Sequence, residues 1–158
     1  MNANSPLTIE VVEPSEDALL QVIGLGKDMW DESPVYRAMP RDIDKMIEFA
    51  YTMMADPNSF FQVAKVGDTC HGFMFGSIAP YGFVDQTFAF DRLLYVRPDM
   101  RGSTAARQLV AAFEQWATDK GASRIILAVT TGVHPEQTEK FYNKCGYTTV
   151  GKLTMKEV

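Results

Sequence analysis

The stretch Leu93-Leu94-Tyr95-Val96-Arg97-Pro98-Asp99-Met100-Arg101-Gly102-Ser103-Thr104-Ala105-Ala106-Arg107-Gln108-Leu109-Val110-Ala111-Ala112-Phe113 decides how this chain folds. Its first four residues are apolar, which predicts a buried strand that Pro98 stops. Arg101 to Thr104 then open a predicted helix, which Gly121 ends. The apolar side of this helix repeats at a spacing of 3.6 residues and comprises Ala106, Leu109, Val110, Phe113 and Trp116.

The junction between this strand and this helix has the composition of an anion site. A helix start carries unpaired backbone N–H groups and partial positive charge, to which a phosphate binds well. Gly102 lets a ligand approach the backbone, and the residues from Ser103 to Ala106 are all small. Arg101 and Arg107 add positive charge. Because a single glycine-rich turn is a weak signal, a turn shaped only for packing is an equally good interpretation of these residues.

Two motifs in the right order resemble the GNAT superfamily of N-acetyltransferases. Residues 96–102, Val-Arg-Pro-Asp-Met-Arg-Gly, followed by a helix of small residues, look like the family's acetyl-CoA signature. Residues 141–147, Phe-Tyr-Asn-Lys-Cys-Gly-Tyr, resemble its closing motif. The family's cofactor loop usually reads Gln/Arg-x-x-Gly-x-Gly/Ala. Aligned on Gly102, this chain has Asp99 at the first position and Thr104 at the last, so it departs from the pattern at both.

The resemblance implies a cofactor, acetyl-CoA as co-substrate, and residues that bind it. Its acetyl group and pantetheine arm would meet strand backbone at Leu94, Tyr95 and Val96. Its pyrophosphate would lie at the turn, with the following residues: Arg101, Gly102, Ser103, Thr104, Ala105, Ala106 and Arg107. His71 and His134 have no companions at metal-ligand spacing, so we expect no metal site.

Acyl transfer needs an acid for the leaving thiolate and a base for the attacking amine. The resemblance places Tyr142 beside the cofactor sulfur, so we expect it to be the acid; by local pattern alone it is a core aromatic. Asp91 is the candidate base, because it lies among apolar residues whose burial would raise its pKa. The alternatives are a water base, an Asp91 that only pairs with Arg92 or another cation, and Asp85 as a weaker second choice.

The acceptor pocket is expected in residues 27–41, an irregular stretch that mixes aromatic residues, acids and two prolines. In the resembled family the segment between the first two helices lines the acceptor pocket. The candidate acceptor-binding residues are therefore Trp30, Asp31, Glu32 and Tyr36. The alternative is that both aromatic side chains pack beneath the loop while the acids face solvent.

The whole chain, residues 1–158, is expected to form one α/β domain. Periodicity predicts helices that begin after Ser15 and at Asp42 and Pro135, in addition to the central one. The predicted strands span residues 7–13, 60–66, 71–78, 87–96, 124–130 and 148–157. We expect a mixed, mostly antiparallel sheet flanked by helices, with a βαβ crossover over residues 93–130. Residues 124–130 have the apolar run of a fully buried strand.

The composition restricts the classes of binding partner that we expect. The net charge of −5 argues against general nucleic-acid binding and is compatible with a cationic amine. No signal peptide or membrane-length apolar run is evident, which predicts a cytoplasmic protein without membrane contact. Cys70 and Cys145 make no disulfide scaffold and are interpreted as reduced thiols. The resemblance is compatible with a homodimer.

The sequence thus predicts transfer of an acetyl group from acetyl-CoA to the primary amine of a small molecule, with a peptide or protein amine as second choice. The alternative is a module of the same fold that binds acyl-CoA or another partner without turnover. A different nucleotide-binding domain is disfavoured, because neither Gly-x-x-x-x-Gly-Lys nor Gly-x-Gly-x-x-Gly occurs.

Overall fold

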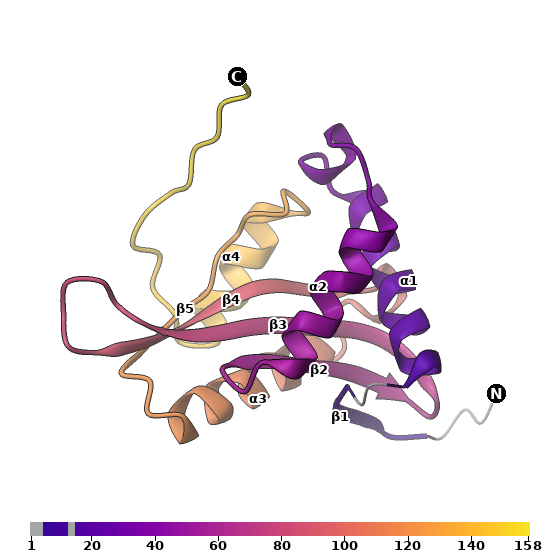
Figure 1. Ribbon diagram of the computed structural model, residues 1–158, viewed down its shortest axis with the longest axis horizontal. Helices are drawn as coiled ribbons and strands as arrows, with labels where there is room; N and C mark the ends of the chain where they lie inside the picture. Colours follow the sequence, from indigo (N-terminus) through magenta and orange to yellow (C-terminus); the bar gives the residue numbers. More distant parts are fainter. Residues whose placement is uncertain (1–4, 13–14) are drawn as a thin grey trace.

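A single five-stranded sheet organises the molecule (Figure 1). The computed structural model describes residues 5–12 and 15–158. Its strands are β1 (Leu7–Val11), β2 (Ser59–Val66), β3 (Thr69–Pro80), β4 (Thr87–Val96) and β5 (Arg124–Ile126), and they lie side by side in that order. The first four pair antiparallel, whereas β4 and β5 pair parallel. This confirms the predicted mixed α/β sheet and its crossover.

Helices cover both faces of the sheet (Figure 1). On one face lie α1 (Glu16–Glu32), the short 3-10 helix η1 (Tyr36–Ala38) and α2 (Ile43–Ala55); on the other lie α3 (Ala105–Asp119) and α4 (Pro135–Lys144). Successive side chains of β3 point to opposite faces of the sheet, so Phe73 and Phe75 pack toward α1 and α2, and Met74 packs toward α3. Each face therefore has its own apolar core.

Several predicted boundaries are confirmed by side-chain capping. The Ser15 hydroxyl accepts from the Ala18 N–H at the start of α1, and the Asp42 carboxylate accepts from the Lys45 N–H at the start of α2. The strand at 87–96 has the predicted bounds. Glu13 and Pro14, where the first strand was expected to end and the next helix to begin, lie outside the described residues.

The predicted irregular stretch at residues 27–41 is wrong in its first part, because α1 continues to Glu32. Gly24 and Gly26 do not end the helix, since buried Leu25 and Met29 keep its apolar side in register with the core. At Gly26 a Cβ would lie 2.8 Å from the Met46 methyl group on α2. This glycine therefore sets the close contact between the two helices rather than a break.

Two strand predictions near the C-terminus are also wrong. The run at 124–130 forms strand only over β5, and Ile126 on it is 39% exposed. The predicted strand at 148–157 is absent: its residues are exposed and pair with no strand in the described chain. Both errors have one physical cause, because β5 is the last strand of the sheet and its outer edge has no neighbour to bury it.

A bulge in β4 shapes the region beside β5. Phe75 on β3 pairs with Leu93, but the next residue, Gly76, pairs with Asp91, so Arg92 is the extra residue on β4. A Cβ at Gly76 would lie 2.3 Å from the Phe113 ring, so α3 packs directly against the sheet here. Pairing between β4 and β5 covers only Phe88 to Phe90. The two strands separate at the bulge, and a gap opens beyond it.

Candidate active site

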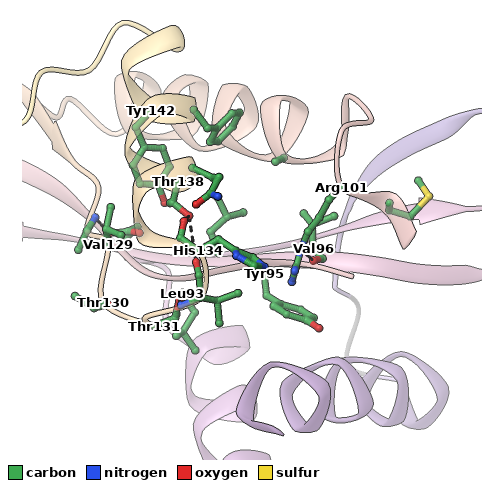
Figure 2. Close-up of a pocket in the computed structure, with 18 of the residues that line it drawn as sticks. Leu93, Tyr95, Val96, Arg101, Val129, Thr130, Thr131, His134, Thr138 and Tyr142 are labelled. Carbon is green, nitrogen blue, oxygen red and sulfur yellow. Dashed lines mark hydrogen bonds between the residues drawn. The ribbon is translucent and has the colours of Figure 1, made fainter. Parts of the chain in front are cut away.

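The gap between β4 and the segment after β5 leads into a cavity of about 490 Å³. Figure 2 shows side chains from β4, the turn before α3, the loop before α4 and α4 itself converging on it. It is lined by residues 91–96, 100–103, 106, 128–131, 133, 134, 137, 138, 141 and 142. None of the helices in the described chain has the length and apolar character needed to cross a bilayer.

One wall of the cavity is the unpaired edge of β4. The Arg97 N–H donates to the His71 carbonyl on β3, so Arg97 points its backbone groups at β3. Because strand residues alternate, the backbone groups of Leu94 and Val96 face the opposite side, into the gap that β5 leaves. The Leu94 N–H is therefore available to a ligand that lies along this edge.

A second wall is the turn before α3. Gly102 has a φ of 86°, and a Cβ there would meet nothing within 4 Å. Ser103 caps locally, because its hydroxyl accepts from the Ala105 N–H. Within the described chain, no acceptor is found for the N–H groups of Gly102, Thr104, Ala106 and Arg107. Four backbone donors thus remain free at a helix start, as the anion-site interpretation predicts.

The structure favours a different alignment of the cofactor-loop pattern, Gln/Arg-x-x-Gly-x-Gly/Ala, from the one that places its first glycine at Gly102. Asp99 does not line the cavity, whereas Arg101 does, and its Nε donates to the Val96 carbonyl at 3.0 Å. With Arg101 first in Gln/Arg-x-x-Gly-x-Gly/Ala, Ala106 is the last residue and fits the pattern. The one departure is then Thr104, the residue before α3, in place of the first glycine of that pattern.

Arg101 also closes the end of the cavity toward α1. Its guanidinium makes two hydrogen bonds with Glu32, of which Nη2 to Oε2 measures 2.6 Å. The Tyr95 hydroxyl donates to the same carboxylate at 3.2 Å. The Arg101 hydrogen bond lowers the pKa of Glu32, and burial together with Glu32 raises the pKa of Tyr95 to about 12. At neutral pH this is an ion pair flanked by a neutral phenol.

The four acceptor candidates do not line this cavity. Trp30 stacks on Tyr36 with ring centroids 5.4 Å apart, and Asp31 pairs with Arg41 at 2.7 Å. Glu32 reaches the cavity rim through Arg101 and Tyr95, both of which line the cavity. Tyr36 packs against the core, and burial and the charge of Asp91 raise its pKa. For Tyr36 the structure thus fits the alternative, in which the aromatic side chains pack beneath residues 27–41.

Asp91 lies at the bulge, on the floor of the cavity. Its Oδ1 accepts from the Ala128 N–H at 2.8 Å, and no cation pairs with it among the described residues. Arg92 donates instead to the Ser77 hydroxyl at 3.1 Å. The expected alternative, a pair between Asp91 and a cation, is therefore wrong. Burial raises the pKa of Asp91 to about 6, despite the hydrogen bond from Ala128.

Tyr142 projects from α4 into the same cavity and is 6% exposed (Figure 2). In the described chain its hydroxyl makes no hydrogen bond. Burial, and then the charge of Asp91, raise its pKa well above the ordinary value of 10.0. The phenol therefore stays protonated at neutral pH and can act as a hydrogen-bond donor.

Of the ten predicted cofactor residues, seven line the cavity: Leu94, Tyr95 and Val96 on β4, and Arg101, Gly102, Ser103 and Ala106 at the turn. The other three, Thr104, Ala105 and Arg107, do not line it. Ala105 is fully buried and packs against the sheet. The Arg107 side chain is exposed. Thr104 and Arg107 can therefore contribute only their free backbone N–H groups to a ligand at the turn, and the Ala105 N–H is already bonded to Ser103.

Sequence reasoning did not foresee the contact that positions the loop before α4. The Ser33 side chain, fully buried, donates to the Thr131 carbonyl and accepts from the Tyr36 N–H at 3.1 Å. This ties the end of α1 to a cavity wall. His134, at the start of α4, lines the cavity with a φ of 45°, unusual for a residue with a side chain. No local signal in the sequence marks either residue.

No group of histidine, cysteine, aspartate or glutamate side chains in the described part of the chain is arranged to hold a metal ion. Cys70 is buried and Cys145 is half-buried, and both are free thiols. The polar groups at the cavity include the backbone donors of the turn, Asp91, Tyr142 and the Arg101 ion pair.

A family model and several solved structures match this chain. The model of the acetyltransferase (GNAT) family matches residues 24–147. No curated protein sequence gives a significant match.

Three similar structures illustrate the fold. Aminoglycoside N-acetyltransferase AAC(6')-Iy, in complex with the bisubstrate analogue CoA-S-monomethyl-acetylneamine, is 20% identical, with a TM-score of 0.76 over 98% of this chain and 99% of that one. An aminoglycoside acetyltransferase from an uncultured soil sample, in complex with sisomicin, is 15% identical, with a TM-score of 0.72 over 96% and 95%. Glucosamine-6-phosphate N-acetyltransferase from Arabidopsis thaliana is 13% identical, with a TM-score of 0.75 over 96% and 98%. At these identities the likeness shows a shared fold.

Proposed function

Because this chain belongs to the acetyltransferase (GNAT) family, we propose that its cavity binds acetyl-CoA and transfers the acetyl group to the primary amine of a small molecule. Membership makes it an acetyltransferase with acetyl-CoA as co-substrate. The observation that supports the residue assignments is that one cavity is lined by Gly102 and Ala106, whose backbone N–H groups are free, by the unpaired edge of β4, and by Asp91 and Tyr142.

The cofactor lies along that cavity in two parts. Its pyrophosphate accepts from the free N–H groups of Gly102, Thr104, Ala106 and Arg107, where the α3 dipole adds positive potential. Its pantetheine arm pairs with the backbone of Leu94 and Val96 as an added strand. The separation of β4 from β5 makes room for this arm, since a paired β5 would occupy the same donors.

The reaction follows from groups around the far end of the arm. The amine nitrogen attacks the thioester carbonyl carbon, and the developing oxyanion accepts from the Leu94 N–H. The C–S bond then breaks, and the thiolate accepts a hydrogen bond from Tyr142. Asp91 takes the proton that the nitrogen loses, directly or through one water. Its pKa of about 6 leaves it ionised, and so able to accept that proton, at neutral pH.

A small-molecule amine is the acceptor we favour. Two of the similar structures are described as aminoglycoside acetyltransferases and one as a glucosamine-6-phosphate N-acetyltransferase, so amino sugars are the first compounds to test. The net charge of −5 suits a cationic acceptor.

The test has two measurements on the same preparation. Calorimetric titration with acetyl-CoA should give a dissociation constant in the micromolar range, about −8 kcal/mol. Release of free thiol should then appear with one or more amines from a panel of aminoglycosides, amino sugar phosphates, peptides and lysine. Absence of binding would overturn the cofactor site. Binding without release for any amine would favour the module that binds acyl-CoA without turnover.

A further inference from the structure

The Arg101 side chain occupies a group on β4 that the cofactor arm would use. Its Nε donates to the Val96 carbonyl at 3.0 Å, and the backbone groups of Val96 face the gap that β5 leaves. Its guanidinium lies 5.6 Å from the centre of the Tyr95 ring, within the range of a cation–π contact. An arm that pairs with this edge as an added strand needs the same carbonyl as an acceptor. Arg101 and the arm therefore compete for one position on the edge of β4.

A pyrophosphate at the turn would be a stronger partner for Arg101 than Glu32 is. Arg101 directly precedes Gly102, whose free N–H is one of the expected pyrophosphate donors. A pyrophosphate carries two negative charges where a carboxylate carries one, and a guanidinium binds phosphate oxygens with the same forked geometry. We therefore expect a bound cofactor to draw Arg101 away from both Val96 and Glu32.

Once Arg101 has moved, Glu32 is a half-buried carboxylate without a cation. In the described chain, its only salt bridge is the one with Arg101. The Tyr95 hydroxyl donates to it at 3.2 Å and keeps it at the cavity rim. The Arg101 hydrogen bond and, more weakly, the charge of His134 on the cavity wall lower the pKa of Glu32. Glu32 thus lies within electrostatic range of the cavity, where an entering cation would replace its lost partner.

Given the acetyl transfer proposed above, on which this step rests, we propose that Glu32 binds an ammonium group of the acceptor and that the cofactor makes Glu32 available by taking Arg101. Each ligand alone must break the pair between Arg101 and Glu32, but the two together break it only once. Cofactor and cationic acceptor therefore bind with positive cooperativity, and the coupling is the same whichever binds first.

The position of Glu32 also defines the class of acceptor. Asp91, the expected base, lies four residues before Tyr95 on β4, and Tyr95 holds Glu32. At the rise of a strand this places Glu32 roughly 10–15 Å from the attacking nitrogen. In Figure 2 Arg101 and Tyr142 lie on opposite sides of the cavity, which agrees with this separation. The acceptor is therefore an amine with a second cationic nitrogen at about this distance, and a monoamine gains nothing from Glu32.

The test is calorimetric titration with three amines, with and without saturating CoA. CoA has the pyrophosphate but no acetyl group, so no transfer occurs during the titration. Diaminooctane spans the separation when extended, diaminopropane is too short, and octylamine lacks the second nitrogen. CoA should tighten the binding of diaminooctane to the wild type by about three- to tenfold. The affinities of the other two amines should change by less than about twofold.

Two variants separate the roles of the pair. Glu32→Gln should bind CoA but bind diaminooctane weakly, with no effect of CoA on that affinity. Arg101→Met leaves Glu32 unpaired at all times, so without CoA it should bind diaminooctane about as tightly as the wild type does with CoA. Asp31→Asn removes the same charge one position away and should keep the full coupling, because Asp31 pairs with Arg41. Thermal unfolding confirms that each variant is folded.

The outcomes distinguish this coupling from the acetyl transfer itself. A wild type that does not bind CoA would overturn the proposed function and the coupling together. A wild type that binds CoA, yet binds diaminooctane equally well with and without it, would overturn the coupling alone. Coupling that persists in Glu32→Gln would remove Glu32 from the acceptor site, and weak binding of diaminooctane by folded Arg101→Met would overturn the exchange of partners.

Discussion

Arg101, in the turn before α3, is held by Glu32, the last residue of α1, sixty-nine positions earlier in the chain. The pair joins the two faces of the sheet at one end of the cavity. The Arg101 side chain is 31% exposed and that of Glu32 25%, so solvent only partly screens their attraction. The one charged side chain of the turn that lines the cavity is therefore neutralised by a carboxylate from the opposite face of the sheet.

Glu32→Gln should tighten the binding of acetyl-CoA by about two- to fourfold at low salt, because it leaves Arg101 uncompensated near the pyrophosphate. The free energy of unfolding should fall by about 1 kcal/mol with the loss of the ion pair. Calorimetry and thermal unfolding measure the two effects.

Asp31→Asn is the matched control for this charge change. It removes the same charge one residue away, but Asp31 pairs with Arg41 and not with the turn. Acetyl-CoA affinity should be unchanged in this variant. Weaker binding by Glu32→Gln would show instead that Glu32 orients Arg101 for the cofactor.

Gly102→Asp should weaken acetyl-CoA binding at least about tenfold relative to Gly102→Asn. Both side chains tolerate the positive φ of this position better than other residues, and a Cβ there meets open space. The two variants differ in one negative charge beside the expected pyrophosphate. Calorimetry on folded preparations of both gives the ratio, and equal affinities would rule out the turn as the phosphate site.

The sequence was informative wherever the chain makes local contacts. The period of the α3 apolar positions, the caps Ser15 and Asp42, and the bounds of β4 all follow from residues a few positions apart. The family motifs added the strand, turn and helix around Gly102. Because these motifs specify the elements that line the cavity, seven of the ten predicted cofactor residues and both catalytic candidates lie there.

Contacts between distant segments escaped prediction. Nothing near Glu32 indicates that Arg101 will bind it, and nothing near Ser33 indicates a bond to Thr131. Gly24 and Gly26 weaken the local helix signal, yet α1 continues through them and packs against α2 at Gly26. The run at 124–130 has the composition of a buried strand. Whether it is buried depends on another strand pairing with its outer edge, and composition does not predict that pairing.

Tyr142→Phe should lower kcat by about 10- to 1,000-fold and leave the KM for acetyl-CoA within about twofold, because it removes a donor to the leaving thiolate but keeps the packing of the ring. Tyr147→Phe is the matched control, since its hydroxyl binds Glu114 and not the cavity. Steady-state kinetics with a saturating amine compare the two. Equal rates for Tyr142→Phe and wild type would assign Tyr142 to the core alone.

Asp91→Asn should have opposite effects on stability and activity. The pKa of Asp91 is about 6 in the folded protein against 3.8 for a free carboxyl, so ionisation favours the unfolded chain. The wild type therefore loses stability as pH rises from about 4 through 6, and the variant, which cannot ionise, does not. At pH 8 Asp91→Asn should be more stable by about 1–3 kcal/mol, with little difference at pH 4.

The activity of Asp91→Asn should fall about 100-fold or more, because the amide cannot accept the proton of the amine. In the wild type kcat/KM should rise with pH up to about 6 as Asp91 ionises, and this limb should vanish in the variant. Asp85→Asn, in the exposed loop between β3 and β4, should leave both profiles unchanged. If Asp91→Asn gains stability yet keeps its activity, the buried carboxylate is not the base, and a water must take the proton instead.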